Sequence, residues 1–103
     1  MIVENYKDIF FKLGKNAKEN QLLIDTSDSN FWWFHLDDYP SGHCVIESNA
    51  INKEMRYFAA NLIKQNIKYK NKRLKIVYTQ IKNLKNTKTI GEVITSNTLY
   101  FTI

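Results

Sequence analysis

The sequence contains little cysteine, proline or glycine: one cysteine, one proline and three glycines among 103 residues. Because Cys44 is alone, it cannot form an internal disulfide, and no second thiol is present for a cysteine-type zinc site. A single cysteine also fits a reducing compartment. The sequence has no internal repeat and no low-complexity segment, so these figures indicate one compact domain.

The chain also lacks a long apolar run. The most apolar window, residues 31–36, is far shorter than the roughly 20 residues that cross a bilayer. The first residues, MIVENYKD, include acidic side chains where a secretory signal has a basic patch followed by an apolar stretch. We therefore expect a soluble, cytoplasmic protein with no membrane partner.

The residues that are present suffice for one hydrophobic core, because 44% are hydrophobic and 14% are aromatic. A chain of this size buries roughly 60–70% of its extended surface on folding, which supports one core but not two. Intrinsic disorder and a separate cofactor domain are therefore excluded. The sequence predicts a single domain over residues 1–103.

Charge is distributed unevenly along the chain, although the net charge is only +5. Residues 1–50 contain four lysines and eight acidic residues, a net charge of −4, whereas residues 51–103 contain eleven basic and two acidic residues, a net charge of +9. This asymmetry is typical of a protein that binds a polyanion, because each neutralised phosphate releases counterions. The alternative is a solvated basic face without a partner.

The pattern of apolar residues predicts an α+β fold with a mainly antiparallel sheet. Apolar spacings of three and four predict one long helix at about residues 52–66, and an asparagine before good helix formers predicts one short helix at about residues 16–24. The aromatic run at 31–36 is expected at the centre of the sheet. The predicted strands are 2–3, 9–13, 31–36, 43–47 and 74–79, followed by 93–95 and 99–103 as a closing hairpin around Ser96–Asn97.

Two segments carry polar residues that suit a binding site. Gly14 and Lys15 stand at a strand-to-helix junction, where free backbone N–H groups can hold an anion, although the second glycine and the Ser/Thr of a phosphate-binding loop are missing. An ordinary helix cap with a solvated lysine is the alternative. The second segment has two histidines, His35 and His43, around a loop that contains Asp37 and Asp38.

That histidine loop could form a metal site or an acid–base pair, but its spacing does not place two imidazoles on one ion. Neutral histidines beside aromatic residues can also stack on unpaired bases, and protonated ones can meet phosphate. We therefore predict no catalytic residue, no metal and no cofactor. An enzyme that uses His35, Asp37, Asp38 and His43, with a divalent metal, is the lesser alternative.

The order of several short motifs resembles the NFACT-R domain, the RNA-binding module of the NFACT proteins. The similarity extends over nearly the whole chain. The matching segments are 13–20 (LGKNAKEN), 33–35 (WFH), 40–46 (PSGHCVI), 59–60 (AA), 77–79 (VYT), 83–85 (NLK) and 91–93 (GEV). The sequence is more similar to the stand-alone eukaryotic branch than to the full-length proteins, but it lacks that branch's coiled coil and has Asn86 where a second lysine is expected.

The resemblance implies a non-enzymatic module that binds RNA, either transfer RNA or ribosome-associated RNA, and that is related to ribosome quality-control factors. It does not imply the nascent-chain extension of full-length NFACT proteins. Alternatives are a protein-interaction module that docks on ribosomes or a translation factor, and DNA binding. The predicted nucleic-acid-binding residues are Lys15 and Asn16 for the phosphate backbone, His35 and His43 on the binding face, and Arg56, Lys64, Lys68, Lys70, Lys72, Arg73, Lys82, Lys85 and Lys88 for the positive field.

Overall fold

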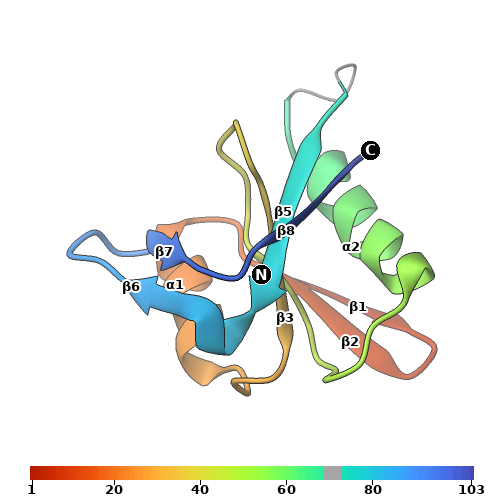
Figure 1. Cartoon of the computed structure of the whole chain (residues 1–103), viewed down its shortest axis with the longest axis horizontal. Helices are drawn as coiled ribbons and strands as arrows, with labels where there is room; N and C mark the ends of the chain where they lie inside the picture. Colours follow the sequence, from red (N-terminus) through yellow and green to blue (C-terminus); the bar gives the residue numbers. More distant parts are fainter. Residues whose placement is uncertain (69–72) are drawn as a thin grey trace.

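The computed structural model describes residues 1–68 and 73–103 and contains a six-stranded antiparallel sheet (Figure 1). Its strand order is β1-β2-β4-β3-β5-β8. The strands are β1 (Ile2–Tyr6), β2 (Ile9–Leu13), β3 (Trp32–Leu36), β4 (Cys44–Ile46), β5 (Lys75–Gln80) and β8 (Leu99–Thr102). A second, two-stranded sheet pairs β6 (Leu84–Asn86) with β7 (Val93–Thr95). The predicted α+β class with a mainly antiparallel sheet is confirmed.

Helix α2 (Lys53–Gln65) packs on one face of the main sheet. Its N-cap is Asn52, whose side-chain oxygen accepts a hydrogen bond from the Met55 N–H at 2.8 Å. Alternate residues of β3 point to this face because strand side chains alternate, and Phe34 is fully buried there. The helix predicted at 52–66 is confirmed.

The opposite face of the sheet is covered by helix α1 (Ala17–Thr26) and by the β6–β7 sheet. Leu23 and Ile24 of α1 pack with Trp33 and Val45 in a second apolar cluster. The shorter helix is also confirmed, but the contrast in length is small, with 10 residues in α1 and 13 in α2. Both faces of β3 are thus covered, and β3 and β4 are the two central strands, as the aromatic run predicts.

The first two strands form a tight hairpin. Lys7 and Asp8 both have positive φ, 51° and 66°, which is the geometry of a two-residue type I′ turn. The first strand is therefore longer than the predicted 2–3, because β1 extends to Tyr6, and Lys7 and Asp8 alone connect it to β2.

The predicted closing hairpin is wrong. Strand β7 pairs with β6, and β8 pairs with β5, so the segments around Ser96–Asn97 belong to different sheets. The chain changes sheets at this point because Ser96 is tied to Asn83 and Thr79: the Ser96 N–H donates to the Asn83 carbonyl at 3.0 Å, and the Thr79 hydroxyl donates to the Ser96 carbonyl at 3.0 Å.

Neither α1 nor α2, nor any other helix within the described part of the chain, has the length and apolar character of a membrane span.

Candidate functional site

The two polar segments singled out in the sequence meet at the end of β2. The Gly14 N–H donates to the His43 carbonyl at 3.0 Å, and the His43 N–H donates to the Asn20 side-chain oxygen at 3.1 Å. A Cβ on Gly14 would lie 2.1 Å from that Asn20 oxygen, and a Cβ on Gly42 would lie 2.2 Å from the Gly14 carbonyl oxygen. Only glycine permits this close approach, so Gly14 and Gly42 join the start of α1 to the histidine loop.

The start of α1 has the reciprocal cap of an exposed helix N-terminus. Asn16 accepts from the Glu19 N–H at 2.9 Å, and the Glu19 carboxylate accepts from the Lys15 N–H at 3.0 Å. The remaining first-turn N–H groups have no partner within the helix and leave partial positive charge at this end. The helix cap is therefore present, and the Glu19 carboxylate at this end also pairs with the Met1 ammonium group at 2.9 Å. Anion binding by the Gly14–Lys15 segment stays a prediction.

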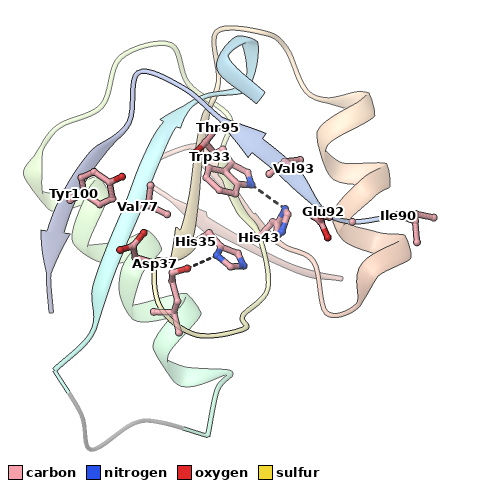
Figure 2. Close-up of a pocket in the computed structure, with 12 residues that line it drawn as sticks. Trp33, His35, Asp37, His43, Val77, Ile90, Glu92, Val93, Thr95 and Tyr100 are labelled. Carbon is pink, nitrogen blue, oxygen red and sulfur yellow. Dashed lines mark hydrogen bonds between the residues drawn. The ribbon is translucent and has the colours of Figure 1, made fainter. Parts of the chain in front are cut away.

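The two histidines are packed against each other under the segment that leads into β7 (Figure 2). Their rings lie 4.9 Å apart and nearly perpendicular, and the His35 ring also stacks on Trp33. Only 5% of His43 is exposed, and His35 is half-buried. Burial, with a contribution from His35, lowers the pKa of His43 from 6.5 to about 3, and burial also lowers the pKa of His35. Both imidazoles are therefore neutral at pH 7.

Hydrogen-bond partners define which nitrogen of each neutral ring carries the proton. The Trp33 indole N–H, which can only donate, lies 3.1 Å from His43 Nδ1, so this nitrogen accepts and the proton is on Nε2. His35 Nδ1 contacts the Leu36 carbonyl oxygen, which can only accept, so His35 carries its proton on Nδ1. The pair consequently presents one donor, His43 Nε2–H, and one acceptor, His35 Nε2.

A groove of about 560 Å³ lies beside the histidines, between the start of α1 and the end of α2. We call it the basic groove; its polar lining includes Lys15, Asn16, Asn20, His35, His43 and Lys68. Five of these are predicted nucleic-acid-binding residues, and no carboxylate belongs to the groove wall in the described part of the chain. The groove thus combines two lysines with the positive end of a helix.

A second cavity, of about 390 Å³, lies on the other side of the histidines (Figure 2). We call it the aromatic hollow; it is lined among others by Trp33, Asp37, Val77, Glu92, Val93 and Tyr100. His35, His43 and Gly91 border both cavities. Sheet residues form the floor of the hollow, because Trp33 and Val77 point away from α2, while Tyr100 of β8 and Val93 of β7 stand on opposite sides.

The other predicted residues do not join this site. Arg56 lies on the α2 side of the sheet, with its guanidinium carbon 6.0 Å from the centre of the Tyr78 ring. Lys82 is at the opposite end of β5 and donates to the Asn30 side chain at 3.3 Å. Lys64 is half-buried, and Arg73, Lys85 and Lys88 are exposed. Lys70 and Lys72 lie outside the described residues. The positive residues that can be placed are therefore distributed over several surfaces.

Some residues of the site are not among the predicted binding residues. The sequence pattern places Tyr100 in a closing hairpin, and it offers Asp37 only for the enzyme alternative. Gly91 stands out only as part of a short motif; it has a φ of +79° and approaches α1 so closely that a Cβ would lie 2.8 Å from Ala17 Cα. Its N–H donates to the Gln21 side chain at 3.0 Å. Gly91 thus holds the segment that covers the histidines.

Two features of the described residues bear on the enzyme alternative. Among them, no group of three or more His, Cys, Asp or Glu side chains is arranged to hold a metal ion. Cys44 is fully buried, and burial raises the pKa of its thiol, which keeps it protonated and unreactive.

Comparison with known proteins places the chain in a family. One solved structure, "the C-terminal of the fibronectin/fibrinogen-binding protein from Streptococcus suis", has the same fold with a TM-score of 0.88 at 21% sequence identity. The alignment covers 98% of this chain but 43% of that one, so the chain spans less than half of the solved relative. A comparison with curated proteins finds no match. The family model described as the NFACT protein RNA binding domain matches residues 3–102. The chain therefore belongs to the NFACT RNA-binding domain family.

Proposed function

We propose that this domain is a non-enzymatic RNA-binding module and that the basic groove holds the phosphate backbone of the RNA. The observation that carries the proposal is the groove in a chain of an RNA-binding domain family: Lys15 and Lys68, from segments 53 residues apart, border one cavity with the start of α1. A phosphate there would meet lysine ammonium groups and helix N–H groups together.

The state of the histidines supports binding rather than catalysis. His43 Nδ1 is occupied by the Trp33 indole, and the ring is almost completely buried. A general base needs an accessible lone pair within reach of substrate, and of the two rings only His35 Nε2 offers one. We propose that both histidines keep their neutral forms and border the RNA as hydrogen-bonding groups.

For the identity of the RNA, we propose transfer RNA or ribosome-associated RNA, bound in the cytoplasm in connection with ribosome quality control. The support is the resemblance to the module of the NFACT proteins, which act on stalled ribosomes. Docking on a ribosome or a translation factor through protein contacts remains the competing function, and it predicts an association that survives nuclease treatment.

The test is a set of salt-dependent titrations with transfer RNA, single-stranded RNA, duplex RNA and duplex DNA. The Lys15→Glu/Lys68→Glu variant should bind RNA more weakly, and the slope of log K against log salt should fall by roughly 1 for each phosphate that the protein no longer neutralises. Single-residue Lys53→Glu is the first control, because Lys53 is exposed at the start of α2, outside the groove. Lys7→Glu/Lys53→Glu matches the charge change of the double variant, because Lys7 is also exposed and outside the groove.

Weaker binding confined to Lys15→Glu/Lys68→Glu supports the groove. Equal losses in the charge-matched double variant would mean that only net charge matters, and the groove would be the wrong site. Absence of salt-dependent binding to every nucleic acid would overturn the RNA-binding function for this chain.

A further inference from the structure

We propose that the aromatic hollow receives one unpaired base of the bound RNA and that it prefers guanine. This inference rests on the proposed function, because the base belongs to the strand whose phosphate lies in the basic groove. It goes further by assigning a second subsite and a base preference.

The hollow has the size and lining of a base site. Its volume of about 390 Å³ lies within the range of small-molecule sites, about 300–1,000 Å³. Trp33 and Val77 form an apolar floor, and Tyr100 of β8 stands at its rim with 49% of its surface exposed. Unpaired RNA bases bind by stacking on such aromatic side chains. An exposed tyrosine at the rim of an apolar-floored cavity is therefore suited to a base.

The hollow is also placed correctly relative to the groove. The two cavities share His35, His43 and Gly91, so these three residues belong to the wall between the lysine-lined groove and the hollow. A phosphate on the groove side and its base on the hollow side would lie on the two sides of the same imidazole rings. In this arrangement the donor on His43 and the acceptor on His35 lie between the phosphate and the base.

The polar groups of the hollow favour guanine. The Asp37 carboxylate lies at its edge, 3.7 Å from the Lys75 ammonium group, and the Asp37 N–H donates to the Lys75 carbonyl at 2.9 Å, which fixes the residue in register. The Asp37 carboxylate presents two acceptor oxygens to the hollow. The Lys75 ammonium group does not line the hollow; it lies beside it, 4.6 Å from the centre of the Tyr100 ring, and carries N–H donors only. Guanine carries two adjacent N–H donors next to a carbonyl acceptor on its Watson–Crick edge, whereas each of the other three bases offers a single donor position there.

The first experiment compares single-stranded eight-nucleotide RNAs by fluorescence anisotropy: oligouridine, and the same strand with one central guanine, inosine, adenine or cytosine. We expect the guanine strand to bind roughly tenfold more tightly than oligouridine, which is within the range for a two-hydrogen-bond contact. Inosine, which lacks the 2-amino group, should lose most of this gain. This comparison uses the unmodified protein, so no variant has to fold.

Two variants locate the preference. Asp37→Asn removes the carboxylate with little change in size, and its matched control is Asp38→Asn, an exposed neighbour that does not line the hollow. Asp37→Asn should abolish the preference for guanine while binding of oligouridine persists, and Asp38→Asn should keep the preference. Tyr100→Ala should weaken binding of the guanine strand, and Tyr100→Phe should restore it because the ring remains.

The two tryptophans report the position of the base. The Trp33 indole N–H donates to His43 at the hollow, and the Trp32 indole N–H donates to the Asn49 carbonyl at 2.9 Å, away from it. In a ¹H–¹⁵N spectrum, the guanine strand should shift the Trp33 indole signal and leave the Trp32 signal in place. The Trp32→Phe variant assigns the two signals.

Equal binding of all five strands, or a guanine preference that persists in Asp37→Asn, would overturn the inference while the groove proposal stands. Failure of every strand to bind would overturn both.

Discussion

Acidification from pH 7 to pH 5 should destabilise the fold through His43. The neutral ring accepts a hydrogen bond from the Trp33 indole and is packed against His35, so a proton on Nδ1 would break that bond and place a charge in a buried position. The native state therefore resists protonation, and the pKa of His43 is about 3 in the fold against 6.5 when the chain is unfolded.

The size of the effect follows from the difference in bound protons. A histidine whose native pKa is depressed contributes stability above its unfolded pKa of about 6.5, and this stability is lost as the pH falls toward the native value. Between pH 7 and pH 5, His43 stays neutral in the native state while it protonates in the unfolded state, which lowers the free energy of unfolding by about 1.9 kcal/mol. The lowered pKa of His35 adds to this loss in the same direction.

Urea denaturation at pH 7, 6 and 5, followed by tryptophan fluorescence, measures the loss. His43→Asn is the informative variant, because the amide oxygen of asparagine can accept from the Trp33 indole but does not titrate. Its free energy of unfolding should fall by about 1.9 kcal/mol less than that of the wild type over the same pH interval. Equal losses in the two proteins, or a wild-type stability that does not change between pH 7 and pH 5, would refute the buried neutral histidine.

Two further substitutions test the frame around the site. Gly91→Ala should lower the free energy of unfolding by about 1–3 kcal/mol, because the residue has a φ of +79° and the new Cβ would meet Ala17; Ile90→Ala, at the exposed neighbour, should change it little in the same urea titration. Asn20→Ala should cost about 1–3 kcal/mol, because the buried His43 N–H loses its acceptor, and a thermal melt that matches that of the exposed-site control Asn61→Ala would contradict this.

Most of the fold could be predicted because local pattern and tertiary packing agree. In β3, successive residues Trp33 and Phe34 are both buried, one on each face of the sheet, and an uninterrupted aromatic run is the pattern of a strand covered on both sides. Both helices begin at asparagine caps, Asn16 and Asn52, and these caps mark their starts in the sequence.

The aromatic hollow could not be predicted, because it depends on a strand pairing that the pattern does not specify. The sequence pattern identifies 93–95 and 99–103 as strands, but it carries no information about which edge each one joins. Two strands separated by a short Ser–Asn turn favour a hairpin. The actual pairing places Tyr100 opposite Val77 on β5, and this register brings the tyrosine to the rim of the hollow. Because the predicted pairing was wrong, the sequence did not indicate that Tyr100 belongs to the site.

The arrangement of the two cavities follows from incomplete cover on one face of the sheet. Helix α1 covers Trp33 and Val45, but it does not extend over the ends of β3 and β4, where His35 and His43 lie. The segment around Gly91 covers the histidines instead, and the close approach of Gly91 to Ala17 fixes the position of this segment. Because Gly91 borders both cavities, its backbone conformation should affect phosphate and base binding together. Lys15 borders only the groove and Asp37 only the hollow, so substitutions there should separate the two contributions.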